Sequence, residues 1–188
     1  MRYPFAATFI ALSVLTATLR AADSALPDAP TGYSLTAVES SQLKSTTVIY
    51  ETIHASIKEQ GEPIRKALHE LFAKIQVAKI APVGGPIFIY KTIAQNPDEP
   101  LDIDVAIPVV DNTPAPEGCQ SRVLASSPSM TGIFKGPVSA LGRAYSDFFR
   151  QLQRLGKVPA GELRQRNLYY EDEGSANNIV FIEMQTSD

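Results

Sequence analysis

The stretch Lys135-Gly136-Pro137-Val138 begins a pattern that this chain of 188 residues contains twice. It leads into a helical pattern, which is followed by two short apolar stretches at 168–170 and 180–185. Residues 58–64, about 80 positions earlier, lead into the same order of a helical pattern and two apolar stretches, as expected for an internal duplication. The sequence therefore predicts two equivalent units, each with a strand pair, a helix and another strand pair, related by a pseudo-two-fold axis with a cleft between them.

Apolar periodicity places the individual elements. Leu68 and Leu71 recur on one face of the first predicted helix, and Tyr145 and Phe148 on one face of the second. Ser40-Ser41-Gln42 is the predicted turn between the first two strands. The predicted elements, in chain order, are strands 33–39 and 46–54, helix 62–75, strands 87–92 and 101–109, strands 120–125 and 130–134, helix 138–155, and strands 166–171 and 178–185.

Composition limits the classes of function. The chain has 17 Lys and Arg against 20 Asp and Glu, a formal net charge of -3, which offers no basic surface for nucleic acid. Cys119 is the only cysteine, which excludes an intramolecular disulfide and a cysteine-based zinc site, and we expect it to be a half-buried strand residue. His54 and His69 are not joined by an acid cluster, so no metal and no cofactor is predicted.

The first 22 residues have the pattern of an export signal. Arg2 precedes a charge-free stretch at 3–19, and Arg20-Ala21-Ala22 combines charge with small residues at the expected processing point. We expect a signal peptide at 1–22, a flexible segment at 23–32, and an exported protein, either periplasmic or secreted. The alternative is an uncleaved N-terminal membrane anchor.

Three segments of the second half carry a resemblance to a known family. They are Gly132-Ile133-Phe134-Lys135-Gly136-Pro137, Leu141-Gly142-Arg143-Ala144-Tyr145, and Pro159-Ala160-Gly161-Glu162 before Leu168-Tyr169-Tyr170. With this order and spacing, the chain from Tyr33 to Gln185 resembles the GyrI-like small-molecule-binding domain, also called the AraC-type effector-binding domain. The resemblance implies an α+β fold: duplicated β-α-β-β units form an eight-stranded antiparallel sheet, with two helices on one face and a central cleft.

On this basis we expect one domain at 33–188, with a first unit at 33–109, a linker at 110–118 and a second unit at 119–188. The resemblance implies that the cleft takes flat, apolar and often cationic ligands. Regulators of the family carry a DNA-binding segment before this domain, whereas this chain has the export-signal pattern there. We therefore expect no transcriptional role.

The resemblance also implies a glutamate on the last strand that meets the positive charge of the ligand, and Glu183 is the matching residue. The surrounding residues support this role, because a carboxylate among Ile, Val, Phe and Met side chains loses solvation unless it finds a partner. The alternative is a carboxylate at the rim that points to water. Asp104 occupies the equivalent place in the first unit, where a solvated surface acid is the commoner explanation.

Aromatic residues are the other candidates for the cleft. Tyr90 and Tyr170 hold equivalent positions in the two predicted units, and a tyrosine can stack on a ligand ring while its hydroxyl satisfies a polar group. Structural packing is the alternative explanation for each aromatic residue. The predicted ligand-binding residues are Glu183, Tyr90, Tyr170, Phe88, Asp104 and Tyr145.

Three functions remain as alternatives. The preferred one is an exported, stand-alone, monomeric protein that binds or sequesters a lipophilic or cationic small molecule, without nucleic acid and without stable membrane insertion after processing. The second is a hydrolase of reactive small molecules, in which Glu183 would be the general base and Tyr170 or Tyr90 the acid. The third is a protein-interaction module whose groove accepts side chains of a partner.

Overall fold

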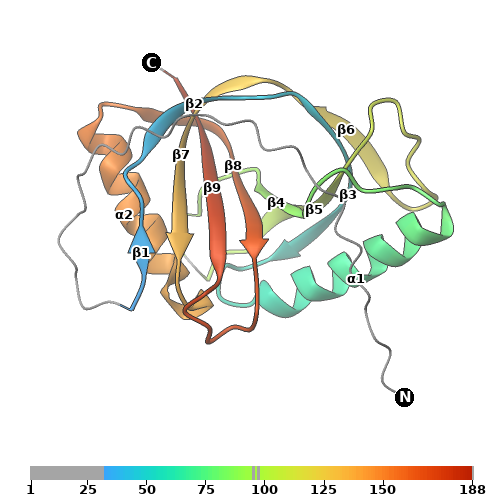
Figure 1. Cartoon of the computed structure of the whole chain (residues 1–188), viewed down its shortest axis with the longest axis horizontal. Helices are drawn as coiled ribbons and strands as arrows, with labels where there is room; N and C mark the ends of the chain where they lie inside the picture. Colours follow the sequence, from blue (N-terminus) through green and yellow to red (C-terminus); the bar gives the residue numbers. More distant parts are fainter. Residues whose placement is uncertain (1–31, 95, 97, 188) are drawn as a thin grey trace.

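The computed structural model describes residues 32–94, 96 and 98–187, and Figure 1 shows how their strands and helices are arranged. The elements, in chain order, are β1 (Ser34–Leu35), β2 (Glu39–Leu43), β3 (Thr46–Ala55), α1 (Gly61–Val77), β4 (Ile87–Tyr90), β5 (Leu101–Val109), β6 (Gln120–Leu124), β7 (Ser127–Lys135), the 3-10 turn η1 (Val138–Ala140), α2 (Leu141–Arg154), β8 (Val158–Tyr169) and β9 (Ile179–Ser187). The signal peptide expected at 1–22 lies outside the described residues and stays a prediction, as does the division into domains. No helix within the described ranges is long and apolar enough to cross a membrane.

The strands of the described chain form one antiparallel sheet of nine strands. Its order is β1-β7-β9-β8-β4-β5-β3-β6, and β2 also pairs with β7. β3, α1, β4 and β5 form the first β-α-β-β unit, and β7, α2, β8 and β9 form the second. β4 pairs with β8, so the two units meet at the centre of the sheet. The predicted α+β duplication is confirmed, with nine strands in the sheet instead of eight.

The strand that leads into each unit pairs with the other unit. β2 ends at Leu43 and β3 begins at Thr46, yet β2 pairs with β7 of the second unit. In the same way β6 ends at Leu124 and β7 begins at Ser127, yet β6 pairs with β3 of the first unit. Figure 1 shows the two connections arching across the molecule. Each unit therefore supplies a strand to the edge of the other.

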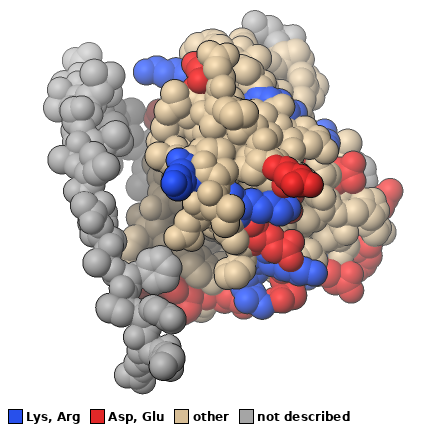
Figure 2. All heavy atoms as spheres, turned by 90° about the vertical axis from the view of Figure 1, so that its right-hand side faces the viewer, with Lys and Arg blue, Asp and Glu red and all other residues tan. Residues whose placement is uncertain are grey.

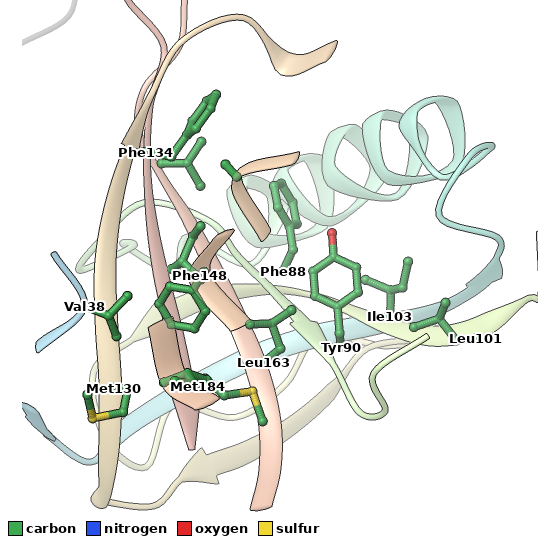
Figure 3. Packing of buried hydrophobic residues seen from close by; sticks show 14 of the residues in the cluster. Val38, Phe88, Tyr90, Leu101, Ile103, Met130, Phe134, Phe148, Leu163 and Met184 are labelled. Atoms are coloured by element: carbon green, nitrogen blue, oxygen red, sulfur yellow. The ribbon is translucent and has the colours of Figure 1, made fainter. Parts of the chain in front are cut away.

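Both α-helices pack an apolar stripe against the same face of the sheet. The stripes have a spacing of four residues: Ala67, Leu71 and Ile75 in α1, and Ala144, Phe148 and Leu152 in α2. Figure 3 shows part of the resulting core, in which Phe88 and Tyr90 of β4 pack with Phe148 of α2 and Leu163 of β8. This cluster contains residues of both helices and joins the two units, and a second cluster around Leu71 and Ile75 lies under the rest of α1.

Some predicted boundaries are wrong, although the strand predicted at 101–109 is confirmed as β5. Ser40-Ser41-Gln42 belongs to β2 because pairing with β7 satisfies its backbone and overrides the turn preference of these residues. The strand predicted at 166–171 begins at Val158, since an irregularity between Pro159 and Leu163 lets this stretch join the sheet. The helix predicted from Val138 begins with the 3-10 turn.

Candidate functional site on the concave face of the sheet

The sheet curves toward the face opposite the two helices, which we name the concave face. Arg122 on β6 and Glu162 on β8 form an ion pair with Nη1 and Oε1 2.6 Å apart. Their strands are four steps apart in the sheet order, which would separate them by about 19 Å in a flat sheet with the usual ~4.8 Å strand spacing. Two side chains of this length meet across that distance only if the sheet bends toward them. The concave face therefore brings residues of both units together.

Apolar side chains form the floor of the concave face. Ile87 and Ile89 of β4 point toward this face, and they alternate with Phe88 and Tyr90, which point toward the helices. The floor consists of Val48, Ile87, Ile89, Ala106 and Leu124, with the partly buried Tyr50 packed against them. Since the floor residues are almost fully buried, the side chains that cover them decide what the face offers to a ligand.

A row of polar and charged side chains crosses this floor. Glu183 of β9 lies opposite Arg164 of β8, and Arg164 lies opposite Ile89 of β4. Ile89 in turn lies opposite Asp104 of β5, and Asp104 opposite Thr52 of β3. Directly opposed side chains on one face of a sheet stand about 5 Å apart and interact. The row thus connects the two predicted carboxylates, one from each unit.

Asp104 is completely buried, so its expected position as a solvated surface acid is wrong. Its carboxylate accepts a hydrogen bond from the Thr52 hydroxyl at 2.7 Å and one from Arg122 Nη2 at 2.9 Å. Lys91 Nζ lies 3.0 Å from its Oδ1. These three partners replace the water that the carboxylate gives up on burial.

The ion pairs continue from the first unit into the second. Arg122, which already contacts Asp104, also contacts Glu162 of β8. Glu162 then accepts hydrogen bonds from Arg164, at 3.3 Å from Nε and 3.1 Å from Nη2. Arg122 also stacks over the Tyr50 ring, 5.3 Å from its centroid. One connected network therefore ties β6 and β5 to β8.

Glu183 is 1% exposed, so its predicted loss of solvation is confirmed. Its Oε1 lies 3.2 Å from Nε of Arg166, while its buried Oε2 meets no hydrogen-bond donor within the described residues. Burial raises the pKa of the Glu183 carboxyl, and the charges of Arg166 and Arg164 partly oppose this rise. The carboxylate lies neither at a solvated rim nor in a purely apolar pocket, because two arginines stand beside it.

The predicted aromatic residues lie on the other face of the sheet. Phe88, Tyr90 and Tyr145 belong to the core under the helices, as Figure 3 shows for Phe88 and Tyr90. The Tyr90 hydroxyl donates to Gln60 Oε1 at 3.0 Å, and the Tyr145 hydroxyl donates to Gln165 Oε1 at 2.6 Å. Burial raises the pKa of both phenols, Tyr90 and Tyr145. These contacts are those of packed core tyrosines.

Tyr170 is not the structural counterpart of Tyr90, contrary to the prediction. Tyr90 is the last residue of β4 and is 5% exposed, whereas Tyr170 follows the end of β8 and is 52% exposed. The structure therefore brings Glu183 together with none of the predicted tyrosines. The Glu183 and Tyr170 pair expected of a hydrolase is not assembled.

Several residues of the concave face were missed by the sequence interpretation. They are Tyr50, Lys91, Arg122, Glu162, Arg164 and Arg166. The alternation of Arg164 and Arg166 with Leu163 and Gln165 was a usable signal, since it places both arginines on one face of β8. Charged residues on one face of a strand are ordinarily assigned to solvent, which hid this signal.

The remaining polar candidates do not form a second site. Among the described residues, no group of three His, Cys, Asp or Glu side chains could hold a metal ion. His54 Nδ1 lies 3.1 Å from Asp102 Oδ1, in an exposed pair. Cys119 is partly buried and lies before β6 instead of within a strand, with its thiol 3.5 Å from Glu51 Oε1. The prediction of no cofactor stays a prediction.

Two surface hollows lie away from the predicted residues. One of about 490 Å³ lies between Thr47, Asp111 and Ser121, and one of about 430 Å³ lies between Lys74, Val77 and Pro116. Figure 2 shows that acidic and basic side chains interleave on the side of the molecule that faces right in Figure 1, instead of gathering by sign. This side of the molecule therefore has no extended patch of one charge sign in the view of Figure 2, and a charged ligand would be recognised by individual side chains.

No protein-family model and no curated protein sequence matches this chain. Solved structures do share its fold. EcmrR, in a cryo-EM structure of its DNA complex, is 14% identical with a TM-score of 0.69 over 83% of this chain, and the chain spans 58% of the EcmrR chain. The separate C-terminal domain of EcmrR is 14% identical to this chain, with a TM-score of 0.60 over 80% of this chain and 96% of that domain.

Two further structures have the same fold. SAV2435 bound to tetraphenylphosphonium is 16% identical, with a TM-score of 0.57 over 80% of this chain and 93% of that one. A hydrolase from Listeria innocua is 6% identical, with a TM-score of 0.53 over 80% of this chain and 91% of that one. At these identities the likeness shows the fold alone. The chain shares the fold of these structures, a duplicated α+β fold of the kind that the sequence resemblance implied.

Proposed function

We propose that this chain is a small-molecule-binding domain whose ligand contacts the concave face of the sheet around Glu183. The observation that carries the proposal is the buried Oε2 of Glu183, which has no hydrogen-bond donor within the described residues. A buried polar atom without a partner costs about 1–3 kcal/mol, and sites that tolerate this cost are often functional. A ligand that reaches Glu183 and supplies a donor would recover that energy.

The composition of the face also suits a small molecule. Ile87, Ile89 and Ala106 form an apolar floor, and the charged side chains that cover it come from both units. Ligand sites are typically apolar surfaces with a few convergent polar groups. The bound tetraphenylphosphonium of SAV2435 shows that a protein of this fold can hold a lipophilic cation, which supports small-molecule binding here without fixing the charge of the ligand.

We also propose that the domain acts outside the cytoplasm, because of the charge-free stretch at 3–19 and the small residues that follow it. The chain spans only part of EcmrR, so the regulatory role of that protein is not transferred.

Isoleucine methyl groups provide a test of the site, because they report on the two faces separately. Ile87 and Ile89 lie on the concave face, whereas Ile103 and Ile182 lie under the helices. We expect a small aromatic probe such as 2-naphthamide to shift the methyl NMR signals of Ile87 and Ile89 in a saturable manner. Shifts confined to Ile103 and Ile182 would move the site to the helix face. The absence of saturable shifts for 2-naphthamide and for its charged analogues would refute small-molecule binding.

A further inference from the structure

We propose that the concave face recognises the anionic group of an amphiphilic small molecule, a carboxylate or a phosphate ester, and that Arg166 is its main anchor. This inference rests on the proposed function, since it concerns the same face, and it names the class of ligand. The anionic group contacts Arg166, and a hydrogen-bond donor elsewhere on the same molecule contacts Glu183 Oε2. It departs from the cationic ligands that the sequence resemblance implied.

Three of the four basic side chains of the concave face lie closer to solvent than the acidic ones, whereas Arg164 is only 3% exposed. The exposed fractions of the side chains are 39% for Lys91, 32% for Arg166 and 30% for Arg122, against 19% for Glu162, 1% for Glu183 and 0% for Asp104. A ligand that approaches from solvent meets ammonium and guanidinium groups first. The carboxylates lie beneath them and act as their counter-charges.

Arg166 has fewer partners than the other exposed cations. Lys91 and Arg122 share Asp104, and Arg122 also pairs with Glu162. Arg166 contacts Glu183 through Nε, at 3.2 Å and without the alignment of a hydrogen bond. Its terminal nitrogens have no acceptor among the described residues. A guanidinium with both terminal nitrogens available binds a carboxylate or phosphate at two points, which a lysine cannot do.

The charge balance of the face points the same way. Within the ion pairs around Asp104 and Glu183, four basic side chains stand against three acidic ones, which leaves one positive charge: Lys91, Arg122, Arg164 and Arg166 against Asp104, Glu162 and Glu183. Asp102, on the same face of β5, lies outside these ion pairs and contacts His54. A monovalent anion neutralises this excess. A lipophilic cation beside Glu183 would stand among these basic side chains, where like charges repel in a partly desolvated site.

A probe series with one apolar body and different charges tests the proposal by titration calorimetry. The probes are 2-naphthoate and 2-naphthyl phosphate as anions, 2-naphthamide as the neutral analogue, and (2-naphthylmethyl)trimethylammonium as the cation. We expect at least one anion to bind at least tenfold more tightly than 2-naphthamide, and the cation to bind more weakly than 2-naphthamide. The order of the two anions identifies whether a carboxylate or a phosphate is the natural group.

Three variants assign the preference to Arg166. Arg166→Met keeps the unbranched stem of the side chain and removes the guanidinium group, and it should abolish the preference for the anions over 2-naphthamide. Arg150→Met is the matched control, because the Arg150 side chain is exposed on α2, on the other side of the sheet from the concave face, and pairs with Asp147. Glu183→Gln releases Arg166 from its acidic neighbour and should strengthen anion binding several-fold, a direction that general damage to the fold would not produce.

The outcomes separate this inference from the proposed function. Binding of 2-naphthamide or the cation as tightly as the anions, or an unchanged anion preference in Arg166→Met, would overturn the inference and leave small-molecule binding standing. The absence of binding by all four probes would overturn both. Far-UV circular dichroism and melting temperature establish that each variant is folded before its titration is interpreted.

Discussion

Replacing Asp104 by asparagine should destabilise the fold far more than the same change at Asp102, two residues earlier on β5. Asp104 is completely buried and accepts contacts from Thr52 at 2.7 Å, Arg122 at 2.9 Å and Lys91 at 3.0 Å. Asparagine has nearly the same shape and keeps one acceptor, but it removes the charge. Asp102 is 53% exposed and its partner is the exposed His54.

The magnitude follows from the number and the exposure of the partners. A hydrogen bond to a charged group contributes about 1.5–3 kcal/mol, and Asp104 has two charged partners. Both partners are about one-third exposed and can be rehydrated, so the sum must be reduced. We expect Asp104→Asn to lower the free energy of unfolding by about 2–4 kcal/mol, which corresponds to roughly 5–15 °C in melting temperature for a chain of this size. Asp102→Asn should cost less than about 0.5 kcal/mol, as exposed pairs do.

Urea unfolding followed by far-UV circular dichroism measures both variants, which suits a chain without tryptophan. The reasoning is refuted if the two substitutions cost the same within about 0.5 kcal/mol, because the buried network would then be worth no more than an exposed pair. A loss below about 1 kcal/mol for Asp104→Asn would refute it as well, since two charge-assisted contacts cannot be worth so little in a buried network.

Three other expectations can be checked on the same protein. Lowering the pH from about 7.5 to about 5 should stabilise the wild type relative to Glu183→Gln. The folded state raises the pKa of Glu183 and therefore binds its proton more tightly than the unfolded state, and this stabilisation is lost as the pH rises through the folded-state pKa. Parallel curves of unfolding free energy against pH for the two proteins would contradict this. Tyr145→Phe should cost about 1–3 kcal/mol in urea unfolding, because the buried amide oxygen of Gln165 loses its donor, whereas an unchanged midpoint would mean that water replaces the phenol. Intact-mass analysis of protein from the native host should find a first residue between Ala21 and Leu26, and an unprocessed N-terminus retained in membranes would contradict cleavage.

The duplicated fold was predictable because apolar periodicity reports burial directly. Leu71 and Phe148 mark the buried faces of the helices, and the alternation at 101–109 marks β5. The exchange of β2 and β6 between units was not predictable. The sequences Glu39–Leu43 and Gln120–Leu124 are polar, and their partners lie about 70 to 90 residues away in sequence.

The candidate site was predictable only in part, for a related reason. Alternation tells which residues of one strand share a face, but it does not tell which faces of two strands are the same. Tyr90 and Glu183 both appeared suited to a cleft, and the pairing of β4 with β8 and of β8 with β9 places them on opposite faces. The buried Arg164 was missed because it and its partner Glu162 precede the strand predicted at 166–171, whereas β8 begins at Val158.

β2 pairs with β7 of the second unit and β6 pairs with β3 of the first, so each half of the chain completes the sheet of the other half. A fragment that ends after β5 would carry β2 without β7, its pairing partner, and would leave the outer edge of β3 open. The complementary fragment would carry β6 and the open edge of β7. Open edges are the surfaces on which strands associate, so two fragments severed within 110–118 should reassemble without a covalent link. The chain can thus be regarded as a dimer whose two subunits have been joined end to end, with the linker supplying proximity and the strand exchange supplying recognition.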